Sequence, residues 1–148
     1  AKYYFARSLY HLNQIDEAKK ELMEVLAKKE NHSMAHQLLS KIYADEGKYS
    51  ISRLFYEKTI RFITHRYPED KDLLFSIYNL FADLLQEERN YAKSNYFFLK
   101  TLPYHEEIKS ENSVITTTTN IIENYIKLNQ LDSAKYYLKR FCTNIIES

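Results

Sequence analysis

Five histidines and a single cysteine are the side chains with the best potential for metal binding or nucleophilic chemistry in this 148-residue sequence. His32 and His36 are four residues apart, so on a helix they would share one face, as the two ligands of zinc-binding helices do. Those helices also carry a general-base glutamate between the ligands, and the segment "HSMAH" has none. We therefore expect solvated or core side chains rather than metal ligands at His11, His32, His36, His65 and His105.

Cys142 is the only cysteine, so it cannot form a disulfide within the chain. It stands in an apolar segment with helical spacing, where Lys139 is the one basic residue in a neighbouring helical position. Activation as a nucleophile needs a stronger electropositive surrounding than this. We expect a buried structural thiol in a reducing compartment, and hence a cytoplasmic protein.

Other motifs have a functional and an ordinary interpretation. The triplet "NHS" at 31–33 has the spacing of an N-glycosylation site, which matters only in a secreted protein. The run "TTTT" at 116–119 could offer hydroxyls to a ligand or could be a packed helix start, although β-branched residues lower helix propensity. One glycine cannot build a phosphate-binding loop. No catalytic constellation is visible, so we expect no enzyme activity, no cofactor and no metal.

Composition restricts the class of protein. Lys and Arg total 21 against 20 Asp and Glu, and no run of five or six like charges occurs, so direct nucleic-acid binding is not expected. No apolar stretch approaches the roughly 18 residues of a membrane-spanning helix. One Gly and two Pro leave few means of making tight hairpin turns, which argues against an all-β fold.

The elements that would position these residues are indicated by an internal repeat. "LNQIDEAK" at 12–19 returns as "LNQLDSAK" at 128–135, and two further copies lie between them, at 46–60 and 88–102. Each copy carries a small residue at one fixed position. The residue twelve positions earlier is also small in three of the four copies, so the repeat has two columns of small residues. A short turn between two helices that cross closely explains this spacing, because small side chains let the backbones approach. The two columns are Ala18, Ser52, Ser94 and Ala134, and Ala6, Ser40, Ala82 and Ile122.

Large apolar residues flank both small columns in register, which indicates amphipathic helices. The turn column holds Asn13, Gly47, Arg89 and Asn129, and Asn and Gly tolerate the left-handed conformation that ends a helix. The apolar columns are Phe5, Leu39, Phe81 and Ile121; Leu9, Tyr43, Leu85 and Tyr125; Ile15, Tyr49, Tyr91 and Leu131; and Leu22, Tyr56, Phe98 and Leu138.

This pattern of small and aromatic columns over about 34 residues resembles the tetratricopeptide repeat (TPR). The match covers nearly the whole chain, but the characteristic tryptophan is replaced by Lys2, His36, Tyr78 and Thr118. The resemblance implies an all-α, right-handed superhelical solenoid of about four antiparallel helix hairpins, with a concave face lined mainly by the first helix of each repeat. We expect one domain over 1–148, with repeats at about 1–30, 33–67, 70–104 and 110–148.

The spacings between the second small residues are 34, 42 and 40, so residues are inserted after the second and third repeats. The first insertion should lengthen helices up to Pro68, whereas the polar segment "PYHEEIKSENS" should form a loop followed by a cap at Ser110, Asn112 or Ser113. The expected helices are 1–12, 15–29, 33–46, 49–67, 70–88, 90–103, 112–128 and 131–146.

A concave binding face follows from projecting the first helices. Tyr3 and Tyr10 lie off the apolar columns and are candidates for partner contact. Charge along the face changes from basic at Arg7 and Lys41 to acidic at Asp83, which would orient an extended peptide of opposite polarity. The predicted binding residues are Tyr3, Arg7, Tyr10, His11, Gln37, Lys41, Asp45, Asn79, Asp83, Glu87, Thr119, Glu123 and Lys127.

The best-known TPR proteins hold a peptide's terminal carboxylate with Lys, Asn and Arg. The corresponding positions here are Tyr3, Arg7, Leu38, Ser76 and Leu80, so that mode is not expected. The leading hypothesis is a non-catalytic protein- or peptide-binding scaffold. The alternatives are a ligand-sensing segment of a larger signalling or transcription regulator, self-association through the end hairpins, and a solvated face without a ligand.

Overall fold

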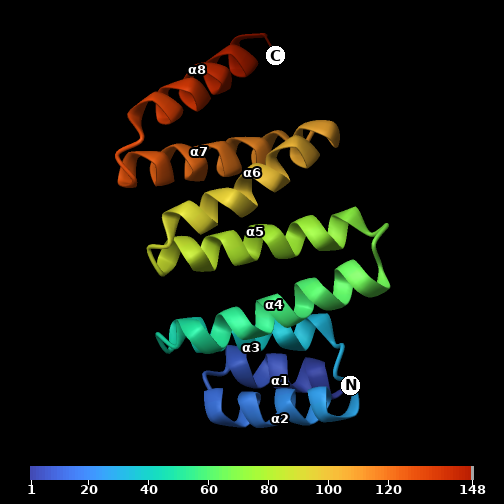
Figure 1. Cartoon of the computed structure of the whole chain (residues 1–148). Helices are drawn as coiled ribbons and strands as arrows, with labels where there is room; N and C mark the ends of the chain where they lie inside the picture. The colour runs from blue at the N-terminus through green and yellow to red at the C-terminus, as the bar shows by residue number, and fades with distance from the viewer. Residues whose placement is uncertain (148) are drawn as a thin grey trace. The chain divides into compact units, whose positions relative to one another are not determined.

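The computed structural model describes residues 1–147 and is all-α over that range (Figure 1). The predicted helices are confirmed, and most of their ends agree within one or two residues. The eight helices of the described residues are α1 (Lys2–His11), α2 (Ile15–Lys28), α3 (Ser33–Asp45), α4 (Tyr49–Arg66), α5 (Lys71–Glu87), α6 (Tyr91–Glu107), α7 (Glu111–Lys127) and α8 (Leu131–Glu147).

The chain divides into two compact units, Ala1–Asp70 and Lys71–Ser148. In unit 1, α1 pairs with α2 and α3 with α4, and α3 packs on both helices of the first hairpin. In unit 2, α5 pairs with α6 and α7 with α8, and α6 packs extensively on α7. Each unit therefore contains two stacked helix hairpins, while a single domain over all four hairpins stays a prediction.

The two small columns mark the helix crossings, as predicted. Ser52 and Ser94 are fully buried, and each donates a hydrogen bond across its hairpin to the residue twelve positions earlier. The Ser52 Oγ lies 2.7 Å from the carbonyl oxygen of Ser40, and the Ser94 Oγ lies 2.8 Å from that of Ala82. A serine side chain is short, so it reaches the carbonyl of the other helix only where the two backbones lie close together. These serines are small enough to allow the close approach, and their hydrogen bonds also stabilise it.

The four hairpin turns share one backbone geometry. Asn13, Gly47, Arg89 and Asn129 all have positive φ, between 56° and 74°. The residue after each of them donates its backbone N–H to a carbonyl five residues earlier, as in Gln14 to Leu9 at 2.9 Å. This bond closes the helix end in the manner of a Schellman motif. The position thus dictates the left-handed conformation even where the residue is Arg.

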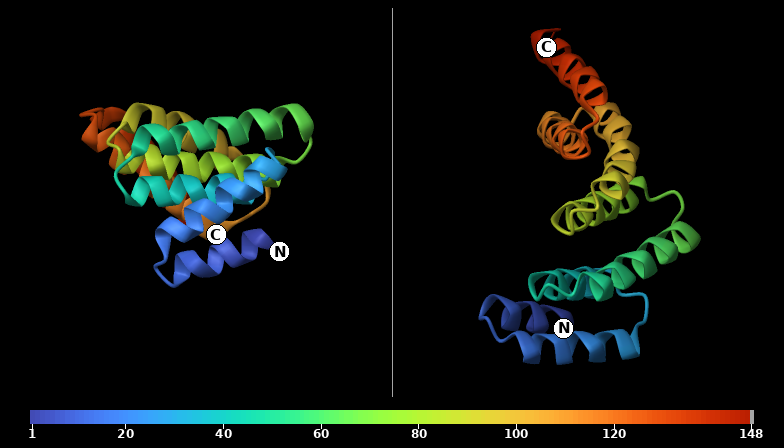
Figure 2. Two further views of the ribbon diagram at one scale, coloured as in Figure 1. Left: turned by 90° about the horizontal axis from the view of Figure 1, so that it is seen from below. Right: turned by 60° about the vertical axis from the view of Figure 1, so that its left-hand side comes forward.

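The polar segment after the third repeat was wrongly predicted to be a loop. Helix α6 continues through Pro103 to Glu107, and its ribbon is unbroken along its length (Figure 2). Proline in a helix interior removes a backbone hydrogen bond. Burial outweighs that loss here, because Tyr104 and His105 beyond the proline are 9% and 7% exposed. The Tyr104 ring also stacks on Phe75 with ring centroids 4.6 Å apart.

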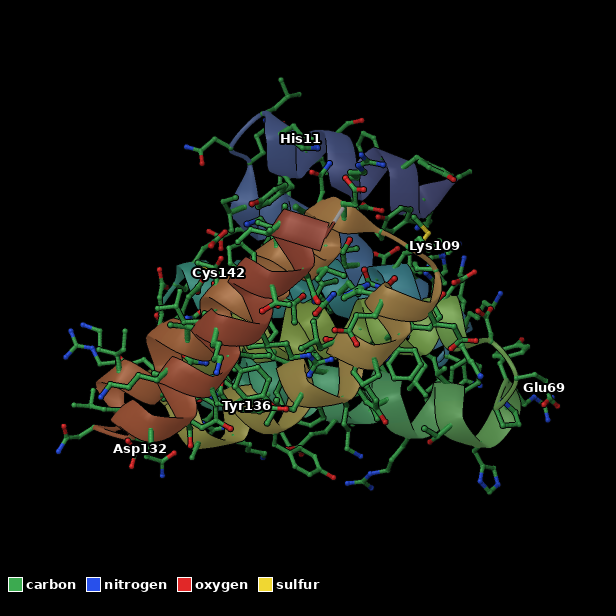
Figure 3. The ribbon with its side chains drawn as sticks, turned by 90° about the horizontal axis from the view of Figure 1, so that it is seen from above. His11, Glu69, Lys109, Asp132, Tyr136 and Cys142 are labelled. Atoms are coloured by element: carbon green, nitrogen blue, oxygen red, sulfur yellow. The ribbon has the colours of Figure 1, made fainter. Side chains whose placement is uncertain are left out.

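Four side chains expected in the core are exposed. Phe5 lies on a face of α1 that α2 and α3 leave open, and Leu131 and Leu138 lie on α8, which packs extensively against α7 alone within the described chain. Cys142, also on α8, is exposed rather than buried (Figure 3). The apolar columns thus identify helical faces correctly, but a face is buried only where a neighbouring helix covers it.

Candidate binding pocket of unit 2

A polar cavity of about 240 Å³ lies between the first helices of the two hairpins in unit 2. Helix α5 contributes Asn79 and Asp83, one turn apart, and the ring of Phe98 on α6 supplies an apolar surface. Hydroxyl and amide side chains of α7 complete the lining: Asn112, Ser113, Thr116, Thr117 and Asn120. The sequence run of four threonines thus contributes two of its hydroxyls to this pocket.

The Asn79 amide is held by two internal hydrogen bonds. Its Oδ1 accepts from Thr101 Oγ1 at 3.0 Å, which orients the amide, and its Nδ2 donates to His105 Nε2 at 2.7 Å. This orientation of the amide places the imidazole proton of His105 on Nδ1, which has no hydrogen-bond partner among the described residues. Burial lowers the pKa of His105, so the ring is neutral near pH 7. His105 and Thr101 therefore act as positioning residues for Asn79.

Asp83 is the one charged side chain in the pocket lining. Surrounding protein raises the pKa of its carboxyl to about 6, and the charge of Glu87, one turn further along α5, adds to the shift. The residue as a whole remains exposed, so the carboxylate sits at the edge of the pocket and not in the core. No Lys, Arg or His in residues 1–147 forms an ion pair with it.

A buried amide network in the same unit ties α5, α6 and α7 together. Asn124 is 0% exposed, and its Nδ2 donates to Ser94 Oγ at 3.0 Å and to Asn95 Oδ1 at 2.9 Å. Its Oδ1 accepts from Gln86 Nε2 at 2.9 Å, and Asn95 Nδ2 donates to the Ile121 carbonyl at 3.3 Å. All hydrogen-bonding groups of Asn124 thus have partners, as a buried amide requires. The network fixes the spacing of the two helices that wall the pocket.

Only two residues of this pocket were predicted from the sequence. Asn79 and Asp83 were predicted, and Glu87 influences Asp83 without lining the cavity. Thr119, Glu123 and Lys127 are exposed on α7 outside the lining, and Thr119 Oγ1 donates to the Ile115 carbonyl at 2.8 Å. Four of the five pocket residues of α7 precede Thr119, and Asn112, Ser113 and Asn120 give a polar signal that the projection did not use.

In unit 1 four of the predicted residues, Tyr3, Tyr10, Lys41 and Asp45, make internal contacts. Tyr3 is 9% exposed and stacks on His32 with centroids 5.2 Å apart. It also lines a pocket with Lys29 and His32, and its contact with a partner stays a prediction. Tyr10 Oη donates to Asp45 Oδ2 at 3.2 Å, and Lys41 Nζ lies 3.9 Å from the same oxygen. Tyr3 is buried because it packs in the apolar cluster that α1, α2 and α3 form.

A second cavity of about 420 Å³ lies at the turn end of unit 1. Its carboxylates have nearby cations: besides the Asp45 contacts, Glu46 pairs with Lys19 at 2.5 Å and with Lys48 at 2.8 Å. The hydrogen bond from Lys19 is the main cause of a lowered pKa at Glu46. Arg7 is exposed and Gln37 half-buried, and neither lines this cavity. Its lining is Tyr10, His11, Asn13, Ile15, Ile42, Asp45 and Glu46.

The two closely spaced histidines have structural roles. His32 Nδ1 accepts the backbone N–H of Ala35 at 3.2 Å and thereby caps α3, and the buried His36 donates from Nε2 to the Glu30 carbonyl at 2.7 Å. No group of three or more His, Cys, Asp or Glu side chains is placed to hold a metal ion in the described part of the chain. None of the described helices combines the length and apolar character needed to cross a membrane.

Comparisons with known proteins define the fold. No protein-family profile and no curated protein matches the chain in sequence. Among solved structures, BtubC (BKLC) from P. vanneervenii is similar, with a TM-score of 0.80 and 13% identity over 94% of this chain and 59% of that one. A Podosopora anserina protein named as a kinesin light chain with nearly identical TPR-like repeats gives a TM-score of 0.74 and 13% identity, covering 96% of this chain and 72% of its own. The chain thus spans little more than half of BtubC, and its fold is a TPR-like arrangement of helix hairpins.

Proposed function

We propose that this chain is a non-catalytic scaffold that binds a protein or an extended peptide through the first helices of its hairpins. TPR-like modules are typically protein-binding and typically lack catalytic activity. The observation that carries the proposal is the polar pocket of unit 2, which is walled by the first helices α5 and α7.

The chemistry of the pocket suits a polypeptide ligand. An extended peptide presents one N–H and one C=O per residue, and both need partners when they leave water. Amide and hydroxyl side chains can donate and accept, and the lining offers both kinds on α7. Asn79 is already oriented by Thr101 and His105, so little side-chain entropy is lost when it meets a ligand.

Binding should be tested with an array of synthetic 12-residue peptides and with a pocket-filling variant. Thr116→Phe places a ring at the pocket wall and should lower the affinity for captured peptides about tenfold or more, because it removes the space they occupy. Thr143→Phe, on the exposed surface of α8, is the matched control and should bind like the parent chain.

The predicted broader face is tested by Thr119→Phe, two positions beyond the threonines of the pocket. A loss at Thr116 alone supports the pocket, and losses at both positions extend the binding face along α7. Circular dichroism and thermal melting check that each variant is folded. Peptide capture that is the same for Thr116→Phe and the parent would refute the proposal.

A further inference from the structure

The Asp83 carboxylate faces a cavity without a counter-ion. Of the residues that line the pocket, α6 contributes Phe98 and α7 contributes only neutral amides and hydroxyls. The charged side chain that acts on Asp83 is Glu87, on the same helix. Glu87 is also acidic, so it adds negative charge near the Asp83 carboxylate and does not neutralise it. A partly desolvated carboxylate beside a second acid is unfavourable for folding, and groups with such shifted pKa values cluster at functional sites.

The carboxylates that line the cavity of unit 1, in contrast, have partners within the chain. Asp45 has Lys41 and the Tyr10 hydroxyl, and Glu46 has two lysines. Asp83 lies in an equally helical setting with no such partner in the described residues. The missing partner therefore points to an external cation.

The size of the pocket limits what that cation can be. Sites for whole small molecules usually measure about 300–1,000 Å³. A cavity of about 240 Å³ is below that range and fits a single side chain. The Phe98 ring gives the pocket an apolar surface for the aliphatic stem of a side chain, and Asp83 places a negative charge at the rim. Lysine and arginine side chains combine an apolar stem with a charged end and match this arrangement. A lone carboxylate provides too little charge for a divalent metal, which prefers several oxygen ligands.

We propose that the unit 2 pocket receives the cationic end of a lysine or arginine side chain from the bound partner, with Asp83 as its counter-ion and the α7 amides as further contacts. This inference rests on the proposed function and specifies the chemistry of its partner as basic.

The first test uses small probes and needs no identified partner. n-Butylammonium and methylguanidinium represent the two side-chain ends, and 1-butanol is the neutral control. In ¹H–¹⁵N NMR spectra, the cations should shift the side-chain amide signals of Asn112 and Asn120 in a saturable way at millimolar concentration, and 1-butanol should not. Asp83→Asn should weaken the binding of both cations at least tenfold. Equal binding of 1-butanol, or full binding by Asp83→Asn, would overturn the inference.

The pH dependence gives a readout that a purely structural Asp83 would not produce. Cation binding should strengthen between about pH 5 and pH 7 as the carboxyl ionises, and Asp83→Asn should abolish this dependence. The Tm of Asp83→Asn should exceed that of the parent at pH 7.5 and approach it near pH 4, because the raised pKa makes the ionised parent less stable. A lower Tm at pH 7.5 together with pH-independent cation binding would overturn the counter-ion role.

The peptide array separates this inference from the proposed function. Peptides that bind should lose affinity when Lys is replaced by norleucine or Arg by citrulline. If Thr116→Phe blocks capture but these neutral replacements do not, the pocket binds peptides and the basic specificity is wrong. If Thr116→Phe has no effect, the binding function itself is wrong.

Discussion

Ile42 in unit 1 and Asn124 in unit 2 occupy the same place in their repeats, two residues after the small column on the third helix of each unit. Ile42 is 1% exposed and belongs to an apolar cluster with Ala6, Leu22 and Leu39. Asn124 is 0% exposed and belongs to a hydrogen-bonded network. The same backbone packing therefore tolerates two kinds of interior.

The positions that surround Ile42 and Asn124 also differ between the two units. Unit 1 has Tyr10, Ala18 and Lys19 where unit 2 has Gln86, Ser94 and Asn95. The polar set of unit 2 supplies every partner that Asn124 needs. In unit 1 the Tyr10 hydroxyl and the Lys19 ammonium bond to Asp45 and Glu46, and Ala18 has no polar side-chain group. A buried polar residue is thus acceptable only as part of a complete network. The network also orients α5 and α7, and the pocket that we propose as a binding site lies in the unit that has it.

Exchanging the two residues should give the largest effects. Ile42→Asn removes buried apolar surface and leaves an amide without partners, so the free energy of unfolding should fall by about 4 kcal/mol. Asn124→Ile leaves the amides of Gln86 and Asn95 short of partners but gains apolar burial, and should cost about 2 kcal/mol. Urea denaturation followed by circular dichroism measures both. An Asn124→Ile chain more stable than the parent would show that the network serves geometry alone.

The buried serines allow a finer comparison of the units. Ser52→Ala removes one hydrogen bond to the Ser40 carbonyl and should cost about 1 kcal/mol. Ser94→Ala removes the matching bond and also leaves a donor of Asn124 with one acceptor fewer, so about 2 kcal/mol is expected. Alanine fits both sites sterically, since Ala18 and Ala134 occupy the column elsewhere. Equal losses in urea denaturation would contradict a coupled network in unit 2.

The turn of the second hairpin, in unit 1, and the turn of the third hairpin, in unit 2, differ in strain. Gly47 and Arg89 have nearly the same φ, 74° and 65°, and only glycine adopts this region without a steric cost. Arg89→Gly should therefore stabilise unit 2 by about 1 kcal/mol, whereas Gly47→Ala should destabilise unit 1 by a similar amount. Open space surrounds the Cβ position at Gly47, so backbone strain alone is tested there. Thermal melting of the Arg89→Gly and Gly47→Ala variants measures both effects. A lower Tm for Arg89→Gly than for the parent would argue against strain at that turn.

Each unit buries one histidine, and the two should differ in tautomer. His36 donates from Nε2, whereas His105 accepts at Nε2, so ¹⁵N NMR should find the proton on Nε2 in the first and on Nδ1 in the second. Burial lowers the pKa of both rings. The unfolded chain therefore binds more protons below about pH 6.5, and stability should decline as the pH falls from there.

The variants His36→Gln and His105→Gln isolate that contribution. Glutamine does not titrate, so each variant should show a flatter decline of the free energy of unfolding between about pH 6.5 and pH 5 than the parent. This is a change in slope and is the smallest effect of the series. An unchanged slope in both variants would assign the acid sensitivity to other groups.

The repeat columns were enough to predict the helices, the turns and the helix crossings. Small residues at Ser52 and Ser94 and the left-handed turn at Arg89 follow from spacing, because backbone geometry at these points repeats in every hairpin. What the columns could not predict depends on neighbours in space. The polar residues from Pro103 onward were predicted to form a loop, and only the burial of Tyr104 and His105 shows why the helix continues.

The pocket was harder to predict than the fold for the same reason. A projection from repeat positions treats all first helices alike, but α7 lines its cavity with residues from its N-terminal half. Tyr3 lay off the apolar columns and is nevertheless buried by His32 from the next hairpin. Contacts between residues of different hairpins decide these cases, and they do not appear in a single-repeat pattern.

The exposed thiol of Cys142 gives the chain one native attachment point for a chemical probe. A maleimide dye attached there would sit on α8, whose outer face also exposes Leu131 and Leu138. Its emission would change when another surface covers that helix, whether a ligand protein or a second copy of the chain. Assembly could thus be followed in real time without introducing any new residue.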